Sequence, residues 1–324
     1  MTFSVEACIL LLLTFCIISS NILILLVLFK TEMLKLLNQY FFLSLTISDL
    51  CIGLFIAPFS FWTSLFDRWI YGEKFCHLEA YLAVIFWIAS VYSLTWLSID
   101  HYVAIRKQER YESIMTRTRC VCWVVLIWIA AFSFCSPPIF GTSRARYSRD
   151  AFLCLIDWNH QQAYFITSGM LIIIPPFMAL SFANLYVFTS SYRSKRICYE
   201  QCTESNCRPH LYVMNVIVGA VYVISWLPLC VLQLYEALSV DTPPEIDTAD
   251  ILTLTQIDTG QDMVASARGD LRLSETVAPG QVHFWLVWIA IGNSFWKFPV
   301  YVIWFHDFRT GLAMLCNRIT CCCR

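Results

Sequence analysis

Residues 7–29 read ACILLLLTFCIISSNILILLVLF and include no charged side chain. A helix of about 20 apolar residues crosses the roughly 30 Å hydrocarbon core of a bilayer, so this run is long enough to span a membrane. Six more such runs follow, over about residues 37–64, 75–106, 118–140, 161–190, 209–237 and 281–305. Because they are continuously apolar and do not alternate, they predict helices and not the strands of a membrane barrel. The sequence therefore predicts an all-α membrane protein built as a seven-transmembrane helix bundle.

The composition of the whole chain points the same way. Of its 324 residues, 58% are hydrophobic and 14% are charged, and the mean hydropathy is +0.63. Soluble domains are about 45–50% apolar and about 25% charged, so a soluble enzyme of this composition would expose large apolar patches. A net charge of −1 provides no basic excess for a nucleic acid. No arrangement of nucleophile and base is recognisable, so we do not expect an enzyme, and no metal site is expected.

The distribution of basic residues predicts the orientation. If the N-terminus lies outside, 14 of the 22 Lys and Arg residues fall in inner segments and seven in outer segments, and Lys297 lies within the seventh run. Loops rich in Lys and Arg stay on the cytosolic side. We therefore expect a multi-pass protein of the plasma membrane with an extracellular N-terminus and a cytosolic C-terminus. The first run is expected to remain as an anchor, and not to be cleaved as a signal peptide.

The segments outside the seven runs have distinct compositions. Residues 239–280 hold eight acidic and two basic residues, which is typical either of a disordered outer loop or of an artefact of the gene model. Cys76 and Cys154 lie in expected outer segments, where an oxidising environment allows a disulfide. A short amphipathic helix over about 306–316 ends the membrane domain 1–316, and a Cys-rich cytosolic tail over 317–324 follows it. Four cysteines there are candidates for palmitoylation, namely Cys316, Cys321, Cys322 and Cys323.

Each run also carries a short motif. The first has Asn21 in SSNILILLV, the second has Asp49 in LSLTISDL, and the third begins near Cys76 and ends in DHYVAI. The fourth has Trp128, the fifth has a proline pair at 175–176, the sixth has SWLP with Trp226 and Pro228, and the seventh has NSFWKFPVY. In this order and at this spacing, the motifs make the chain resemble the rhodopsin-like (class A) G-protein-coupled receptors across all seven runs.

The resemblance implies a function and several sites. A receptor of this family binds an extracellular ligand between its helices and activates a heterotrimeric G protein when the sixth helix moves outward. Pro228 would kink that helix and so provide the pivot. The polar cluster that holds sodium in the family maps to Asn21, Asp49, Ser90, Asn293 and Lys297. The surface that faces the G protein maps to Asp100, His101, Tyr102, Arg208 and Tyr301.

The chain departs from the family at several of these positions. His101 replaces the arginine of the third helix, and Arg208 replaces the acid that would pair with it, so the usual ionic latch cannot form. Asn184 stands where the fifth helix of the family has a tyrosine. Lys297 takes the asparagine position of the seventh-helix motif, which predicts an ion pair with Asp49 in place of a sodium ion. The alternative is that Lys297 extends toward the cytosolic interface.

The predicted ligand pocket is aromatic and weakly polar. Its expected lining residues are Ala83, Trp87, Ser168, Trp226, Gln233 and Trp288. This lining favours an apolar or mixed ligand, either a small molecule or a short peptide. Amine receptors of the family carry an acid where this chain has Ala83, so an amine would lack its counter-ion. Glu79 lies one turn earlier and could replace that acid, but we expect it to be a solvated acid at the outer mouth.

Other functions remain open at this point. The departures at His101, Arg208 and Lys297 also suit a receptor-like protein with weak or no G-protein coupling, which would act as a scaffold or dimer partner. A retinal photoreceptor is less favoured because its lysine would lie at the position of Ile291, roughly 9 Å from Lys297 along a helix. A transporter is less favoured because the chain shows no internal repeat and no paired broken helices.

Overall fold

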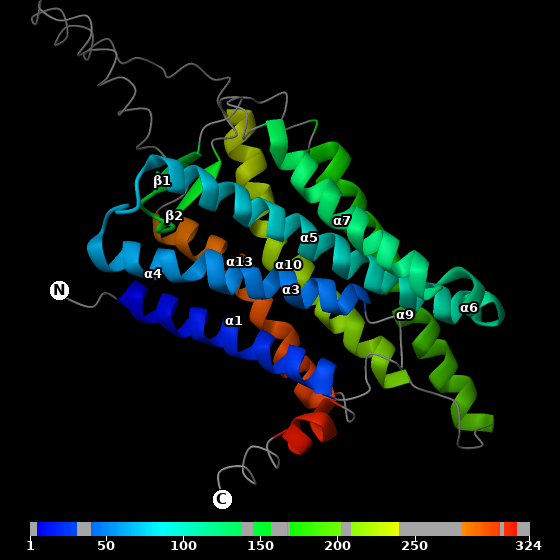
Figure 1. Cartoon of the computed structure of the whole chain (residues 1–324). Helices are drawn as coiled ribbons and strands as arrows, with labels where there is room; N and C mark the ends of the chain where they lie inside the picture. Colours follow the sequence, from blue (N-terminus) through cyan, green and yellow to red (C-terminus); the bar gives the residue numbers. More distant parts are fainter. Residues whose placement is uncertain are drawn as a thin grey trace, which may run out of the picture.

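The computed structural model describes residues 5–30, 40–137, 145–156, 167, 169–201, 209–239, 280–304 and 308–315, without the side chains of 171, 191–201, 209–213 and 236–239. Seven spans of helix lie side by side in an elongated bundle (Figure 1). In chain order they are α1 (Val5–Lys30), α3 (Tyr40–Phe55) with α4 (Ala57–Phe66), α5 (Glu73–Arg106), α7 (Arg117–Pro137), α9 (Ile174–Gln201), α10 (Pro209–Ser239) and α13 (Gly280–Trp304). The predicted seven-helix fold is confirmed.

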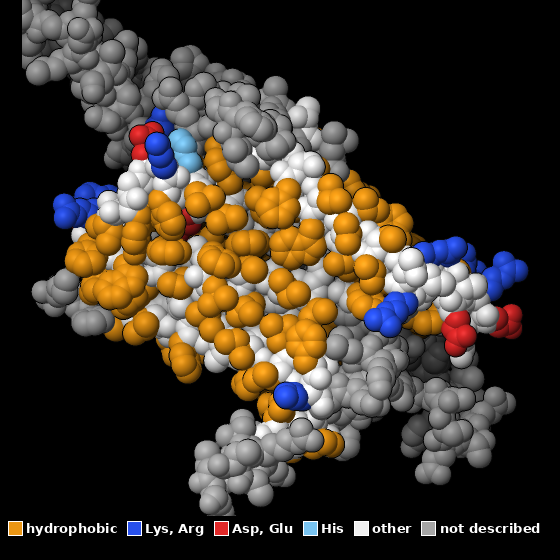
Figure 2. All heavy atoms as spheres, in the orientation of Figure 1, with side chains coloured by type: hydrophobic (Ala, Val, Ile, Leu, Met, Phe, Trp, Pro, Cys, Tyr) orange, Lys and Arg blue, Asp and Glu red, His pale blue; other side chains and the backbone are white. Residues whose placement is uncertain are grey.

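The flank of the bundle is apolar and its ends are charged. Figure 2 shows hydrophobic side chains along the visible flank, with Lys, Arg, Asp and Glu gathered toward the ends. Among the described residues, six helical spans are long and apolar enough to cross a membrane. Their exposed side chains include Leu12, Phe15, Ile129, Phe132, Ile224 and Leu227. Lipid tails stabilise such a surface, whereas water would not, so the chain is a multi-pass membrane protein.

Two spans differ from continuous helices. The second run, expected as one helix over 37–64, is divided at Ile56 into α3 and α4, with a proline at the start of α4. Proline has no N–H and its ring displaces the carbonyl four residues earlier, which accounts for the break. Before α9 the chain forms the π-helical turn η4 (Gly169–Ile173). Side chains of α5 donate to one carbonyl in η4 and to one in the first turn of α9: Tyr92 Oη donates to Ile172 O at 3.1 Å, and Thr95 Oγ1 donates to Pro176 O at 3.3 Å.

One end of the bundle carries a small hairpin that the sequence did not predict. β1 (Ala145–Ser148) pairs antiparallel with β2 (Leu153–Ile156), and Tyr147 lies opposite Cys154. A Cys76–Cys154 disulfide joins β2 to the start of α5, with a Cα–Cα distance of 5.4 Å. The start of α1 lies at this hairpin end, while the short helices η1 (Gln108–Arg110) and α6 (Tyr111–Ile114) lie at the opposite end (Figure 1).

The long helix α5 is the central element of the bundle. It contacts α3, α7, α9 and α10 along its length and both strands at its hairpin end. Its polar side chains face inward: Ser90, Ser93, Ser98 and Asp100 are all buried. Such groups are costly in lipid unless they find partners within the protein. The candidate sites are therefore found along α5.

Candidate functional site

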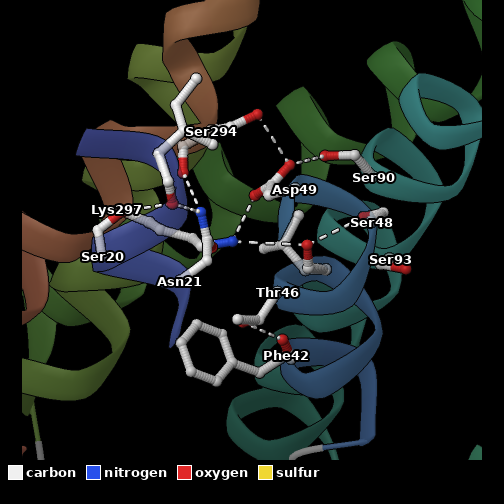
Figure 3. Close-up of polar contacts among 12 residues, drawn as sticks. Ser20, Asn21, Phe42, Thr46, Ser48, Asp49, Ser90, Ser93, Ser294 and Lys297 are labelled. Atoms are coloured by element: carbon white, nitrogen blue, oxygen red, sulfur yellow. Dashed lines mark hydrogen bonds and ion pairs between the residues drawn. The ribbon is translucent and has the colours of Figure 1, made fainter. Parts of the chain in front are cut away.

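Asp49 is the centre of a buried polar cluster in the middle of the bundle (Figure 3). Its Oδ1 accepts hydrogen bonds from Ser90 Oγ of α5 at 3.1 Å and from Ser294 Oγ of α13 at 3.2 Å. Its Oδ2 forms an ion pair with Lys297 Nζ, which also donates to Leu45 O at 3.4 Å. A carboxylate buried in the bundle is thus neutralised by a cation that belongs to the protein.

The position of Lys297 decides between the two sequence interpretations. Its side chain is 2% exposed and turned toward Asp49, as the ion-pair interpretation predicts, so the alternative that it extends to the cytosolic interface is wrong. The ammonium group lies at Asp49 Oδ2 and the Leu45 carbonyl, and the hydroxyls of Ser90 and Ser294 occupy Oδ1, so both carboxylate oxygens are already engaged. A sodium ion therefore does not fit the cluster as these residues arrange it.

The rest of the cluster differs by one residue from the expected set. Asn21 Nδ2 donates to Ile17 O at 2.8 Å and to Ser294 O at 3.1 Å, so it connects α1 to α13. Asn293 was expected to face Asp49, but it is half-buried and Ser294 makes the contact instead. Successive residues of a helix point about 100° apart, and the rotation of α13 that directs Lys297 to Asp49 also selects Ser294.

The expected pocket residues fall into two groups. Trp87 of α5 lies against Trp226 of α10, with ring centroids 5.0 Å apart. Ala83 lies one turn before Trp87 on α5, and both pack against the same cluster of buried hydrophobic side chains. Trp288 instead packs beneath the hairpin, where its Nε1 donates to Ala151 O at 2.9 Å. Gln233 is half-buried on α10. Ser168 lies outside the described residues, as do Arg208, the four palmitoylation candidates, the tail 317–324 and the insert between 240 and 279.

Glu79 contradicts the expectation of a solvated acid. Its side chain is 1% exposed, and its Oε2 accepts a hydrogen bond from the Cys154 backbone N–H at 3.1 Å. The disulfide holds β2 against α5 and so covers the carboxyl group. Sequence reasoning missed this because the hairpin that buries Glu79 was not predicted.

The opposite end of the bundle holds the residues expected to face a G protein. Asp100 and His101 are buried, and Asp100 Oδ1 accepts a hydrogen bond from Tyr111 Oη of α6 at 2.9 Å. Tyr102 packs against Tyr186 of α9, with ring centroids 4.8 Å apart. Tyr301 packs against Phe42 of α3 at 4.7 Å.

A second polar contact at this end was not expected. Asn215 of α10 donates from Nδ2 to Ser98 Oγ of α5 at 2.9 Å and to Asn184 Oδ1 of α9 at 3.4 Å. We call these three residues the asparagine clasp. Gly219 allows the close approach, since a Cβ there would lie 2.0 Å from Asn184 Nδ2. Asn215 is one of two amides in the run 211–235, and the sequence alone does not indicate which groups it contacts.

Comparison with known proteins agrees with this geometry. The family described as "7 transmembrane receptor (rhodopsin family)" matches residues 20–257. The chain is 28% identical over 168 residues to G-protein coupled receptor 161 of Mus musculus, an alignment covering 52% of this chain and 31% of that receptor. It is 29% identical over 167 residues to the Alpha-1A adrenergic receptor of Oryzias latipes, covering 52% of this chain and 35% of that receptor.

A longer alignment exists with the Histamine H2 receptor of Homo sapiens, at 25% identity over 332 residues, covering 100% of this chain and 80% of that receptor. The alignments with the first two relatives span only about a third of those receptors. All three are receptors and none is an enzyme. Because the rhodopsin-family match covers more than half of the chain, this protein belongs to the rhodopsin family of seven-transmembrane receptors.

Proposed function

We propose that this protein is a G-protein-coupled receptor of the plasma membrane. In this proposal the hairpin end and the N-terminus are extracellular, and the end with α6 and the C-terminus faces the cytosol. A small molecule or short peptide binds between the helices at the hairpin end, and a heterotrimeric G protein binds at the opposite end. The family match over residues 20–257 is the observation that carries the proposal.

The geometry supports a route between the two ends. Trp226 contacts Trp87 in the hairpin half of the bundle and lies two residues before Pro228 on α10. Asn215 lies near the other end of the same helix, within the asparagine clasp. A ligand that displaces the tryptophan pair would bias α10 about the proline, and outward movement of its cytosolic end would open the surface for the G protein.

The experiment is a nucleotide-exchange assay with purified receptor and a panel of Gα proteins, with and without candidate ligands. We expect ligand-dependent acceleration of exchange for at least one Gα protein. Tags on the two termini of the receptor in intact cells test the orientation, and tags on the same side of the membrane would contradict it.

A receptor-like protein that couples weakly or not at all is the second candidate. His101 is 5% exposed and replaces a longer, permanently charged residue, so it offers less to a G protein. If His101→Arg accelerates exchange and the wild type does not, this second candidate is favoured. The retinal alternative is not favoured, since the Lys297 ammonium is engaged by Asp49.

A further inference from the structure

The asparagine clasp joins three helices at a point that is closed to solvent. Asn215 and Ser98 are 0% exposed and Asn184 is 8% exposed. Ser98 Oγ donates to Leu94 O at 3.0 Å within α5, so its oxygen remains as the acceptor for Asn215 Nδ2. A buried amide that loses its acceptors bears the full cost of its desolvation, so these bonds oppose separation of α10 from α5 and α9.

Close packing beside the clasp excludes competing partners. A Cβ at Gly219 would lie 2.0 Å from Asn184 Nδ2 and 3.5 Å from Leu180 Cδ1, so only a glycine lets α10 approach α9 this closely. Met214 and Val218 of α10 are buried in the same hydrophobic cluster as Leu180. In apolar surroundings a hydrogen bond is stronger than in water and has no water to compete with it.

The clasp lies far from the pivot of α10. Pro228 is inside the helix, where a proline permits a kink. The interval from Asn215 to Pro228 corresponds to about 20 Å of helix at 1.5 Å per residue, so a tilt of about 10° moves Asn215 by about 3.5 Å. A hydrogen bond of 2.9 Å does not survive such a displacement. Trp226, two residues from the pivot, moves by only about 0.5 Å.

Two other contacts at this end of the bundle connect different helices. Tyr111 of α6 donates to Asp100 of α5, and Tyr102 of α5 packs against Tyr186 of α9. Neither contact involves α10, so neither is broken when α10 tilts. The clasp, by contrast, joins α10 to both α5 and α9.

We propose that the asparagine clasp is the latch that holds the inner half of α10 inward until a ligand binds, with Asn215 as its positioning residue. The inference rests on the proposed function, since outward movement of α10 is the step that would open the surface for a G protein. Hydrogen bonds between membrane helices are individually weak, so the latch is reversible. Its loss should shift the equilibrium between inward and outward α10 by about threefold.

The test measures the position of α10 on the purified full chain in lipid nanodiscs, without a G protein. Spin labels are attached to genetically encoded amino acids at residue 211 and at the exposed Lys107, because 16 cysteines prevent selective thiol labelling. Double electron–electron resonance gives the ratio of outward to inward α10. We expect Asn215→Leu and Ser98→Ala each to raise this ratio about threefold. The double variant should raise it no further than Asn215→Leu, because the two residues share one hydrogen bond.

Thr95→Val is the matched control. Thr95 Oγ1 donates to Pro176 O at 3.3 Å, which joins α5 to α9 and not to α10, so its loss should leave the ratio unchanged. An unchanged ratio in Asn215→Leu and Ser98→Ala overturns the proposal. An equal rise in Thr95→Val, or additive effects in the double variant, also overturns it. Because no G protein is present, a receptor with the latch but without nucleotide exchange refutes only the proposed function.

Discussion

Replacing Lys297 with methionine tests the electrostatics at the centre of the bundle. The substitution keeps the length of the side chain and removes its charge, so Asp49 becomes a buried carboxylate without a cation. Breaking a buried ion pair in this way costs about 3–5 kcal/mol. The hydroxyls of Ser90 and Ser294 continue to donate to Oδ1, which favours the lower end of that range. We therefore expect Lys297→Met to lower the free energy of unfolding by about 3 kcal/mol.

Thermal unfolding of the purified protein in nanodiscs measures this effect. At roughly 2–4 °C per kcal/mol for a chain of a few hundred residues, the expected fall in Tm is about 6–12 °C. Asp49→Leu alone should give a fall of similar size, because it leaves the lysine unpaired. The free energy of unfolding of the double variant should lie within about 1–2 kcal/mol of the wild-type value, because an apolar pair of similar volume replaces a buried ion pair at little cost.

Two results would refute this reasoning. The first is additivity, in which the double variant loses the sum of the two single effects, because independent side chains do not couple. The second comes from exchanging sodium for choline at constant ionic strength. We expect the Tm of the wild type to be insensitive to this exchange and that of Lys297→Met to rise with sodium, so a strong sodium dependence in the wild type would show that Lys297 does not replace the ion.

Three further changes probe other parts of the bundle. Asn215→Leu removes the donor of the asparagine clasp, which holds α10 against α5 and α9. Because hydrogen bonds between membrane helices average about 0.6 kcal/mol, outward movement of α10 becomes easier and basal nucleotide exchange should rise about threefold. Unchanged exchange at equal expression contradicts this. Gly219→Ala places a methyl group against the Asn184 amide and should lower the Tm by an amount equivalent to about 1–3 kcal/mol, with the half-exposed Gly169→Ala as a control in open space. Cys154→Ser removes the disulfide that holds β2 on α5 and should lower the free energy of unfolding by about 2–5 kcal/mol, which thermal unfolding of the two proteins would report.

The spans could be predicted because the bilayer imposes one simple condition on each of them. An apolar run long enough to cross hydrocarbon must be helical wherever it lies in the chain, so runs such as 7–29 and 281–305 appear as α1 and α13 within two residues at each end. The broken second span is the instructive exception. Hydropathy does not detect a proline that interrupts hydrogen bonds, so one expected helix became α3 and α4.

Pairing across the bundle was predictable only where a charge demanded it. Lys297 and Asp49 are both costly in lipid, so the sequence offered their ion pair as one of two interpretations, and the structure decided in its favour. Neutral groups have many possible partners, and neither the exchange of Asn293 for Ser294 nor the asparagine clasp could be read from the chain. Their contacts depend on the rotation of each helix about its axis, which side-chain packing sets.

The sequence by itself determined a membrane bundle of seven helices and its family, because these follow from apolar length and motif order. Only the tertiary structure decided that Glu79 is buried. The hairpin over residues 145–156 has no strong local signal, and it buries that acid by folding back onto α5 through the Cys76–Cys154 disulfide. Burial by a distant segment is a property of the assembled chain, and it places in the interior a carboxyl group that was expected to be solvated.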